Sequence, residues 1–397
     1  MKIKYLSALA LATMISFTSC KDDKKEDTAE STKVDSTAVS EMELQAKDFD
    51  TLIDDKKVSL YWLKNDSIKA AFTNYGGRLV GLWVPDKNGK MTDVVVGMNS
   101  AEGFANASEP YFGATIGRVG NRIAKGKFKL NGEEYTIPQN NNGNTLHGGK
   151  KGFQYVVWDG EKRNDSTLVL HYKSPDMEEG FPGNLDVTVT YSLTSDRSVM
   201  MEYEATTDKA TPVNLTNHAF FNLNGEGSGS ILQHEVQIEA DKFTPVDGGL
   251  IPSGELKKVA GTPFDFTQPH TIGERIEADN EQLNNGGGYD HNFVLTEAQT
   301  GDLNKAATVT GDQSGIVMDI FTQEPGLQFY SGNFMQSKNT FKSGAKDEYR
   351  TAFAMETQHF PDAPNQPEFP QITLEPGDTY HTVSEYKFST TNQEKHP

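Results

Sequence analysis

The segment from Val213 to Leu223 carries a histidine and several amides on one face of an expected strand. Its apolar positions are Val213, Leu215, Ala219, Phe221 and Leu223, and the intervening ones are Asn214, Thr216, His218, Phe220 and Asn222. Side chains of a strand alternate between its faces, so one face suits a core and the other offers polar groups, a ring and an imidazole. Such a face fits a sugar, whose hydroxyls need hydrogen-bond partners and whose apolar side packs on an aromatic ring. A solvated sheet face with a stray histidine is the simpler alternative.

A second expected strand, residues 351–360, sets a carboxylate among small side chains. Alternation puts Glu356 on the same face as Ala352, Ala354 and Gln358. Small neighbours leave room for a ligand, and partial desolvation would raise the pKa of the Glu356 carboxyl toward the working range of a general base. A single strand glutamate can equally well be solvated, so this segment does not decide the function alone.

Further polar side chains occur in segments that do not need them for folding. They are Asp290 and Gln328 in alternating runs, and Asn121, Arg122 and His147 in glycine-rich surroundings. Glycine lets the backbone approach a small molecule closely, which favours a binding role for the last three. The alternatives are structural: Arg122 could form a surface ion pair, and His147 could cap a turn.

The histidines lack the spacing typical of a metal site. None of them forms the i, i+4 pair of a helical zinc site, and a site built on strands would need partners distant in the sequence. Cys20 is the only cysteine, so neither a Cys-based metal site nor an intrachain disulfide can form. We therefore expect no metal ion.

The charge balance excludes one large class of partners. The chain has 397 residues and a formal net charge of −19. Nucleic acid phosphates would be repelled rather than neutralised by such a chain, so we expect no nucleic acid partner. A neutral ligand is easier to accommodate.

The first twenty residues have the pattern of an export signal. A basic start at residues 1–4 precedes an apolar run, 5–17, that is too short to span a membrane as a helix. Two small residues and Cys20 follow, which resembles a bacterial lipoprotein signal whose cysteine becomes the lipidated first residue. We expect a signal peptide at 1–19, a lipidated Cys20, and a membrane-anchored protein on the periplasmic or cell-surface face of the outer membrane. Residues 20–47, rich in charged and hydroxyl side chains, should be a flexible tether.

From about Asp48 onward the pattern is that of strands. Residues 124–138 have the alternation of a hairpin with Asn131-Gly132 at its turn. Other expected strands lie at 166–172, 185–193, 199–206, 235–240, 315–322 and 379–389, and residues 272–283 could hold at most a short helix. There is no βαβ alternation and no glycine-rich phosphate loop. The prediction is an all-β fold, a large single-domain antiparallel β-sandwich over residues 48–397.

Seven segments of the chain resemble the aldose 1-epimerase family, the galactose mutarotases. They are YFGATIGRVGNRIAKGKF (111–128), NTLHGGKKGF (144–153), NLTNHAFFNL (214–223), GTPFDF (261–266), GYDHNFVL (288–295), PGLQFYSGNF (325–334) and METQHFPDAPN (355–365). They run in family order, and several are long and specific. The resemblance implies a galactose mutarotase-like supersandwich that interconverts the α and β anomers of free aldohexoses such as glucose and galactose.

The resemblance also implies roles for the polar residues. Mutarotation opens a cyclic hemiacetal and recloses it on the other face of the aldehyde, which requires a base at the anomeric hydroxyl and an acid at the ring oxygen. The implied roles are Glu356 as base, His218 as acid, His147 as a stabilising group near the ring oxygen, and Asn121, Arg122, Asp290 and Gln328 as sugar-binding groups. No metal or organic cofactor is implied, and we expect a monomer.

These roles require Glu356 to be ionised while His218 is protonated. We therefore expect a bell-shaped dependence of turnover on pH. With ordinary pKa values, the acidic limb would belong to the carboxylate and the basic limb to the imidazole.

Two other functions remain open at this point. A glycoside hydrolase would use two carboxylates, roughly 5 Å apart if retaining and roughly 6.5–9.5 Å apart if inverting. Glu356 and Asp290 could serve, but both histidines would then have no role. A non-catalytic carbohydrate-binding lipoprotein is the other possibility, and it would bind sugar without changing the rate of anomer interconversion.

Overall fold

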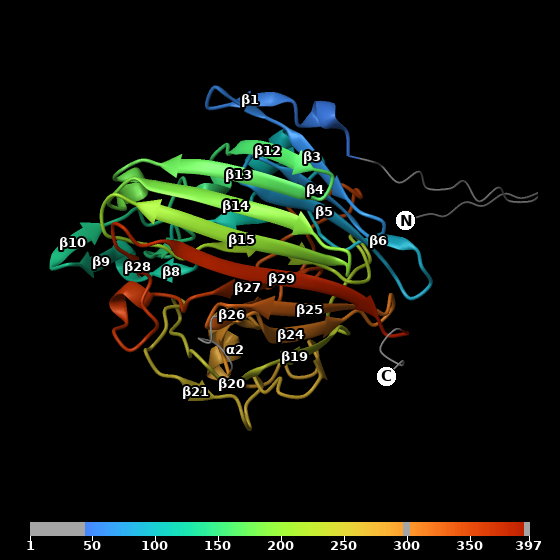
Figure 1. Cartoon of the computed structure of the whole chain (residues 1–397). Coiled ribbons are helices and arrows are strands. Elements are labelled where there is room, and N and C mark those ends of the chain that lie inside the picture. Colours follow the sequence, from blue (N-terminus) through green and yellow to red (C-terminus); the bar gives the residue numbers. More distant parts are fainter. Residues whose placement is uncertain (1–43, 297–301, 393–397) are drawn as a thin grey trace, which may run out of the picture. The chain divides into compact units, whose positions relative to one another are not determined.

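Strands dominate residues 44–296 and 302–392, the part of the chain that this computed structural model describes (Figure 1). The predicted signal peptide, Cys20 and the tether up to residue 43 lie outside the described residues. Leu44 is buried against an apolar cluster, four residues before the predicted domain boundary at Asp48. Within the described residues, no helix is both long and apolar enough to cross a membrane.

Three sheets form the framework, and all of their strand pairs are antiparallel. The nine-stranded sheet consists, in spatial order, of β12 (Asp159–Asn164), β13 (Thr167–Ser174), β14 (Leu185–Leu193), β15 (Ser198–Thr207), β29 (Tyr380–Thr390), β25 (Ile316–Thr322), β24 (Asn304–Thr310), β19 (Glu235–Ile238) and β22 (His270–Thr271). The six-stranded sheet consists of β18 (Phe220–Phe221), β27 (Phe353–Gln358), β26 (Gly326–Tyr330), β23 (Asp290–Leu295), β20 (Ala240–Phe243) and β21 (Lys257–Lys258). The four-stranded sheet consists of β3 (Leu60–Lys64), β4 (Lys69–Thr73), β5 (Arg78–Pro85) and β6 (Met91–Asp93).

Short pairs and helices complete the described elements. The pairs are β1 (Thr51–Ile53) with β2 (Lys56–Val58), β9 (Lys127–Leu130) with β10 (Glu133–Thr136), β8 (Arg122–Ile123) with β11 (Thr145–Leu146), β7 (Ala114–Ile116) with β17 (Thr216–His218), and β16 (Thr211–Pro212) with β28 (Thr373–Leu374). The helices are α1 (Ala101–Ala105), α2 (Glu281–Gly286) and the 3₁₀ turns η1 (Ala46–Asp48), η2 (Ala124–Gly126), η3 (Phe153–Tyr155), η4 (Glu178–Gly180) and η5 (Ala363–Asn365).

The core lies where the nine-stranded sheet packs on the other two sheets. β14 illustrates the cause, because its buried positions alternate strictly with half-buried ones. Its apolar side chains, such as Val187 and Val189, join Phe72 of β4 and Phe329 of β26 in one large cluster. Burying each such side chain contributes about 1.5–3 kcal/mol to folding. The predicted β-sandwich is confirmed.

The six-stranded sheet buries its two faces in different surroundings. Phe329 of β26 and Met355 of β27 point into the large core. Their neighbours Gln328 and Glu356 therefore point to the opposite face, and the two residues lie directly across from each other in the strand register. This second face, turned away from the nine-stranded sheet, carries Asp290, Gln328 and Glu356.

Two local predictions can be compared with the strands. The hairpin around Asn131-Gly132 is confirmed, since Leu130 pairs with Glu133 across that turn. The single strand expected over 213–223 is wrong, because the segment contains two short strands, β17 and β18, that pair with different partners. Its alternation nevertheless holds.

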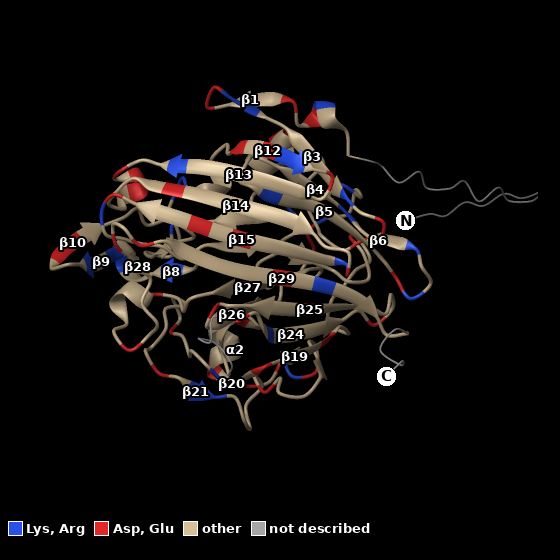
Figure 2. Cartoon of the chain, viewed as in Figure 1, with Lys and Arg blue, Asp and Glu red and all other residues tan. Residues whose placement is uncertain are grey.

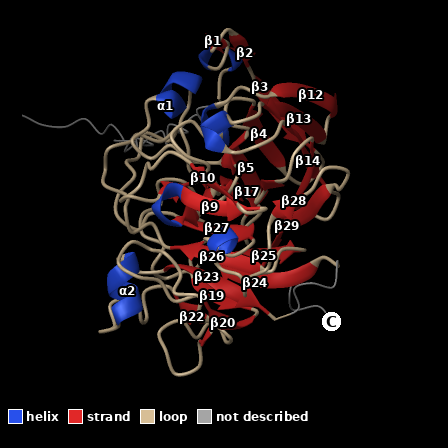
Figure 3. Ribbon diagram, turned by 90° about the vertical axis from the view of Figure 1, so that its left-hand side faces the viewer, coloured by secondary structure: helices blue, strands red, loops and turns tan. Residues whose placement is uncertain are grey.

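Loops and short helices gather beside the strands on one side of the view in Figure 3. Charged residues are spread over the loops and over strands such as β9, β10 and β29 (Figure 2). One covering loop, which carries His147, is held by close backbone contact: a Cβ on Gly148 would lie only 1.9 Å from the carbonyl oxygen of Gly117. Gly148 also has a φ of +83°, a conformation that other residues rarely adopt.

We expect Gly148→Ala to lower the free energy of unfolding more than Gly143→Ala. Gly143, which precedes the short strand β11, has a φ of +78°, but a Cβ there would meet no atom within 4 Å. The control variant therefore has only the backbone strain, whereas Gly148→Ala adds a steric clash of about 1–3 kcal/mol. Urea unfolding of both variants measures the difference, and equal losses would contradict the close contact.

Candidate active site

A cavity of about 470 Å³ opens on the second face of the six-stranded sheet. Its lining residues are Ser108, Glu109, Pro110, Tyr111, Asn121, Arg122, Asn140, Asn141, Asn142, Leu146, His147, Gly149, Lys150, Gln154, Tyr155, His218, Leu250, Asp290, Tyr330, Phe334 and Glu356. Six of the seven site residues predicted from the sequence are among them. The seventh, Gln328, is buried beside the lining residue Asp290.

Three neighbouring strands supply the acidic floor of the cavity. Asp290 stands on β23, Gln328 on β26 and Glu356 on β27, and strand pairing brings all three to one face. Gln328 Nε2 donates to Asp290 Oδ1 at 2.6 Å, which fixes the carboxylate. Because these side chains are borne by paired strands, their separations are set by the sheet rather than by a loop.

The wall that carries His147 and Asn121 is held by two backbone contacts. The N–H of His147 donates to the carbonyl oxygen of Asn121 at 3.0 Å, and the N–H of Asn121 donates to His147 Nδ1 at 3.2 Å. Both residues have positive φ angles, 50° for His147 and 59° for Asn121. Left-handed backbone in residues other than glycine is uncommon and tends to occur at functional sites.

The hydrogen bond from Asn121 fixes the tautomer of His147. Burial lowers the pKa of this imidazole well below its usual value, with smaller contributions from His218 and Arg122, so the ring is neutral. Since Nδ1 accepts a hydrogen bond, the single ring proton must be on Nε2. His147 is therefore a hydrogen-bond donor toward the cavity.

The same tautomer bears on metal binding. Ligand atoms of His147, His218 and Glu356 all lie within 4.8 Å of one another, so the fold does bring distant partners together. A metal-binding histidine, however, normally donates a proton from its other ring nitrogen to an acceptor. The Nδ1 atom of His147 does the reverse, so the trio fits proton transfer better than metal coordination.

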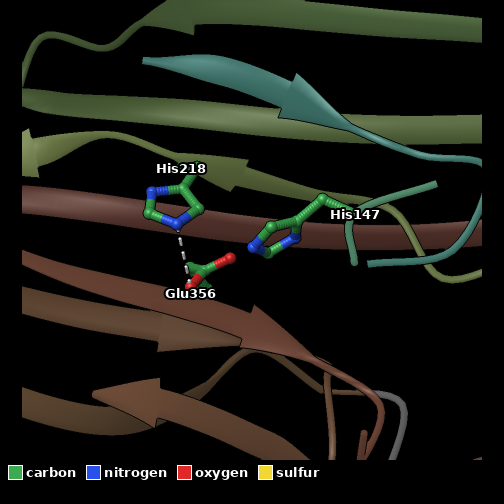
Figure 4. Close-up of side chains that lie close together, drawn as sticks. All are labelled: His147, His218 and Glu356. Atoms are coloured by element: carbon green, nitrogen blue, oxygen red, sulfur yellow. Dashed lines mark ion pairs between the residues drawn. The ribbon is translucent and has the colours of Figure 1, made fainter. Parts of the chain in front are cut away.

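His218 and Glu356 form the centre of the site (Figure 4). His218 Nε2 lies 3.5 Å from Glu356 Oε1, and both side chains are almost fully buried. The His218 ring also stacks on Phe220, with centroids 4.7 Å apart. Among the described residues, Glu356 Oε2 has no hydrogen-bond partner, so this oxygen retains capacity for a ligand.

Desolvation opposes charge on both members of this pair. Burial, with smaller repulsion from Asp290 and Glu109, raises the pKa of the Glu356 carboxyl well above its usual value. Burial also lowers the pKa of His218 to about 3. The neutral pair, a carboxylic acid beside an imidazole, is therefore favoured over the ion pair. Arg122 acts in the opposite direction by lowering the pKa values of Glu356 and Asp290.

The two arginines of the GRVGNR motif have different surroundings. Arg122 lines the cavity, and its Nε has no hydrogen-bond partner among the described residues. Arg118 instead is buried and donates to Ser174 Oγ at 2.6 Å and to the carbonyl oxygens of Pro182 and Gly183 at 2.8 and 3.0 Å. Arg118 thus anchors the motif to the core sheet and leaves Arg122 free to meet a ligand.

Sequence reasoning missed several lining residues and misplaced one. The aromatic rings at the cavity are those of Tyr111, Tyr155, Tyr330 and Phe334. Phe220, whose face suggested a ring for sugar packing, is fully buried and supports His218 from behind. Tyr330 lies on the same strand face as Gln328, as the alternation of residues 326–334 indicates. Residues 108–111 and 140–142 lie in irregular segments, where no periodicity indicates which side chains point inward.

Comparison with known proteins places the chain among sugar epimerases. The sequence profile of the family described as Aldose 1-epimerase matches residues 59–387. Galactose mutarotase from Bos taurus is 43% identical over 332 residues, which are 84% of this chain and 94% of that protein. Aldose 1-epimerase from Escherichia coli K12 is 37% identical over 338 residues, 84% of this chain and 96% of that protein.

Solved structures agree with the sequence comparisons. The structure of an aldose epimerase homologue from C. elegans matches with a TM-score of 0.77 and 30% identity, covering 84% of this chain and 99% of that one. All the residues that line the cavity lie within the matched residues 59–387. The chain therefore belongs to the aldose 1-epimerase family and is an enzyme of that family.

Proposed function

We propose that this protein is a mutarotase that interconverts the α and β anomers of free aldohexoses such as glucose and galactose. The observation that carries the proposal is the contact of 3.5 Å between His218 Nε2 and Glu356 Oε1 in a cavity lined with hydroxyl-binding groups. One acid and one base suffice for the reaction, and this pair can provide both. The relatives named above are galactose mutarotases and aldose 1-epimerases, which supports the same activity here.

The reaction needs two proton transfers around one bond cleavage. Glu356 takes the proton of the anomeric hydroxyl while His218 gives a proton to the ring oxygen, and the bond between the anomeric carbon and that oxygen breaks. The open-chain aldehyde then rotates about its first carbon–carbon bond. Reclosure reverses both transfers on the other face of the aldehyde, so neither residue is consumed.

The remaining groups hold the sugar and stabilise charge. His147, with its proton on Nε2, can donate to the ring oxygen as negative charge develops there. Asn121 and Arg122 are suited to hold ring-oxygen or hydroxyl groups, and Asp290, oriented by Gln328, to accept from hydroxyls further round the ring. Clamping the distal hydroxyls leaves the reacting end free to rotate.

We expect Glu356→Gln to lower kcat by at least about 10² while sugar binding survives, because the amide keeps the shape but cannot accept the proton. His218→Asn should behave similarly. If the two residues act as one relay, the double variant should be little worse than the poorer single variant. Polarimetry on freshly dissolved single anomers measures the rates.

Results of two further assays would favour the other functions. Sugar binding without any acceleration of anomer interconversion by the native protein would indicate a non-catalytic binding protein. Release of chromophore from a chromogenic glycoside would indicate a hydrolase. Near-normal turnover of Glu356→Gln would remove Glu356 from the role of base.

The pH dependence of turnover should reflect the desolvation of Glu356 and His218. The raised pKa of Glu356 and the lowered pKa of His218 reverse their usual order. On lowering pH, the singly protonated pair gains a proton mainly on the imidazole; on raising pH, it loses one mainly from the carboxyl. The productive form, carboxylate with imidazolium, is then a minor tautomer of the singly protonated pair.

The expected profile of kcat/KM is still a bell, but the acidic limb belongs mainly to His218 and the basic limb mainly to Glu356. This reverses the assignment that ordinary pKa values give. Polarimetric profiles of the native protein and of Glu356→Gln provide the measurement, and the native basic limb should be absent from the variant. If the variant instead lost the acidic limb and kept the basic one, the assignment of the limbs that ordinary pKa values give would hold.

We also propose that the protein is an exported lipoprotein anchored through Cys20 and that one chain is the active unit. The sequence pattern of residues 1–20 supports the first point. A small-molecule aldose would then be met outside the cytoplasm.

Cys20→Ser should release the protein from the membrane fraction without altering its specific activity. The physical reason is that the lipid would be attached at Cys20, the first residue of the polar segment 20–47, and this segment separates it from the domain that carries the catalytic residues. Cell fractionation followed by polarimetry provides the measurement. Unchanged membrane association of the variant would exclude the lipid anchor.

A further inference from the structure

Two aromatic rings lie nearly parallel to the imidazole of His218. The ring of Tyr111 is inclined to it by 22° with centroids 5.7 Å apart, and the ring of Phe220 by 27° with centroids 4.7 Å apart. Tyr111 lines the cavity, whereas Phe220 is fully buried and does not line it. The two rings therefore cover the imidazole from the cavity side and from the core side, while its Nε2 edge faces Glu356.

The proposed reaction needs a charge on His218 that its surroundings disfavour. The productive form of the pair carries an imidazolium, yet burial lowers the pKa of His218, and Arg78 acts in the same direction. His147, whose ring centroid lies 5.1 Å from that of His218, is neutral and does not offset this. The carboxylate of Glu356, created by the same proton transfer, favours the imidazolium. Any further group that stabilises the imidazolium increases the population of the productive form.

Aromatic faces can provide this stabilisation without polar atoms. The face of an aromatic ring is the negative end of its quadrupole, and it attracts a cation that lies within about 6 Å of the ring centroid. Both rings meet this distance at His218. The attraction is stronger where water is excluded, as it is around this buried side chain. The neutral imidazole gains less from it, so the two rings favour the charged form.

We propose that Phe220 and Tyr111 are positioning residues that stabilise the imidazolium of His218 during ring opening. This inference rests on the mutarotase function proposed above. Phe220 is separated from the cavity by the imidazole itself, so it acts on the reaction through His218. The rings should raise kcat and leave sugar binding unchanged, because the imidazolium belongs to the reacting form and the neutral pair predominates when sugar binds.

The test replaces Phe220 by mono-, di- and trifluorophenylalanine in turn. Fluorine withdraws electron density from the face of the ring and nearly keeps its shape, so the attraction for a cation weakens in steps. We expect kcat for glucose to fall with each fluorine, by about five-fold over the series, while KM stays constant. Polarimetry on single anomers measures both constants.

The same series at Phe329 is the matched control. Phe329 is also fully buried in the six-stranded sheet, but its ring stacks on Tyr289, with centroids 5.4 Å apart, rather than on an imidazole. Its fluorinated variants should keep the native kcat. Equal losses of kcat in the two series would indicate a general packing effect and overturn the role of Phe220.

Tyr111 needs its own series because it lines the cavity and could instead pack on the sugar. Tyr111→Phe serves as the reference, since every fluorinated member of the series also lacks the hydroxyl group. A stepwise fall of kcat at constant KM would support the contact with His218. A rise of KM at constant kcat would show that Tyr111 packs on the sugar, and would overturn its role here.

Two independent positions keep the inference testable if one series does not fold. A kcat that is independent of fluorination at both positions would overturn the inference and leave the mutarotase function intact. Failure of the native protein to interconvert the anomers of glucose would instead overturn the proposed function.

Discussion

The desolvation of the Glu356 and His218 side chains is the constraint on which the rest of the site depends. Two titratable groups 3.5 Å apart can exchange protons with a sugar only if neither is satisfied by water or by fixed partners. Among the described residues, Glu356 Oε2 meets this condition, because it has no hydrogen-bond partner. The cost is that each charged form is disfavoured, so the pair shares one proton in its neutral form.

The sheets provide the rigidity that this arrangement needs. Glu356 stands on β27 and His218 at the end of β17, and the short strand β18 that follows His218 pairs with β27. The carboxylate is thus backed by Met355 in the large core, and the imidazole is backed by the buried ring of Phe220. Side chains supported by packed strands lose little entropy when a substrate binds, which favours a preorganised site.

The loops supply what strands cannot, namely hydrogen-bond donors that approach from outside the sheet. His147 and Asn121 adopt left-handed backbone conformations and exchange hydrogen bonds, which commits the His147 proton to Nε2. Gly148 permits the backbone contact that holds this loop against Gly117. Arg122 is the permanent positive charge on this wall, and it offsets part of the repulsion among the carboxyls of the floor.

The sequence by itself determined the fold class, the hairpin around Asn131-Gly132 and the two faces of residues 213–223, and it indicated the candidate site residues. These follow from short-range rules, alternation and turn chemistry, and from motifs whose similarity to a known family is specific. Gln328 and Glu356 could be assigned to polar faces because strand alternation is local.

Only the tertiary structure decided which polar faces meet and what burial does to them. His218 and Glu356 are far apart in the sequence, and their contact depends on strand pairing across the chain. The reversal of their pKa order, the tautomer of His147 and the presence of Glu109 in the cavity all arise from long-range packing. A pKa reports the dielectric surroundings of a group, and those surroundings are made by residues that no local pattern in the sequence specifies.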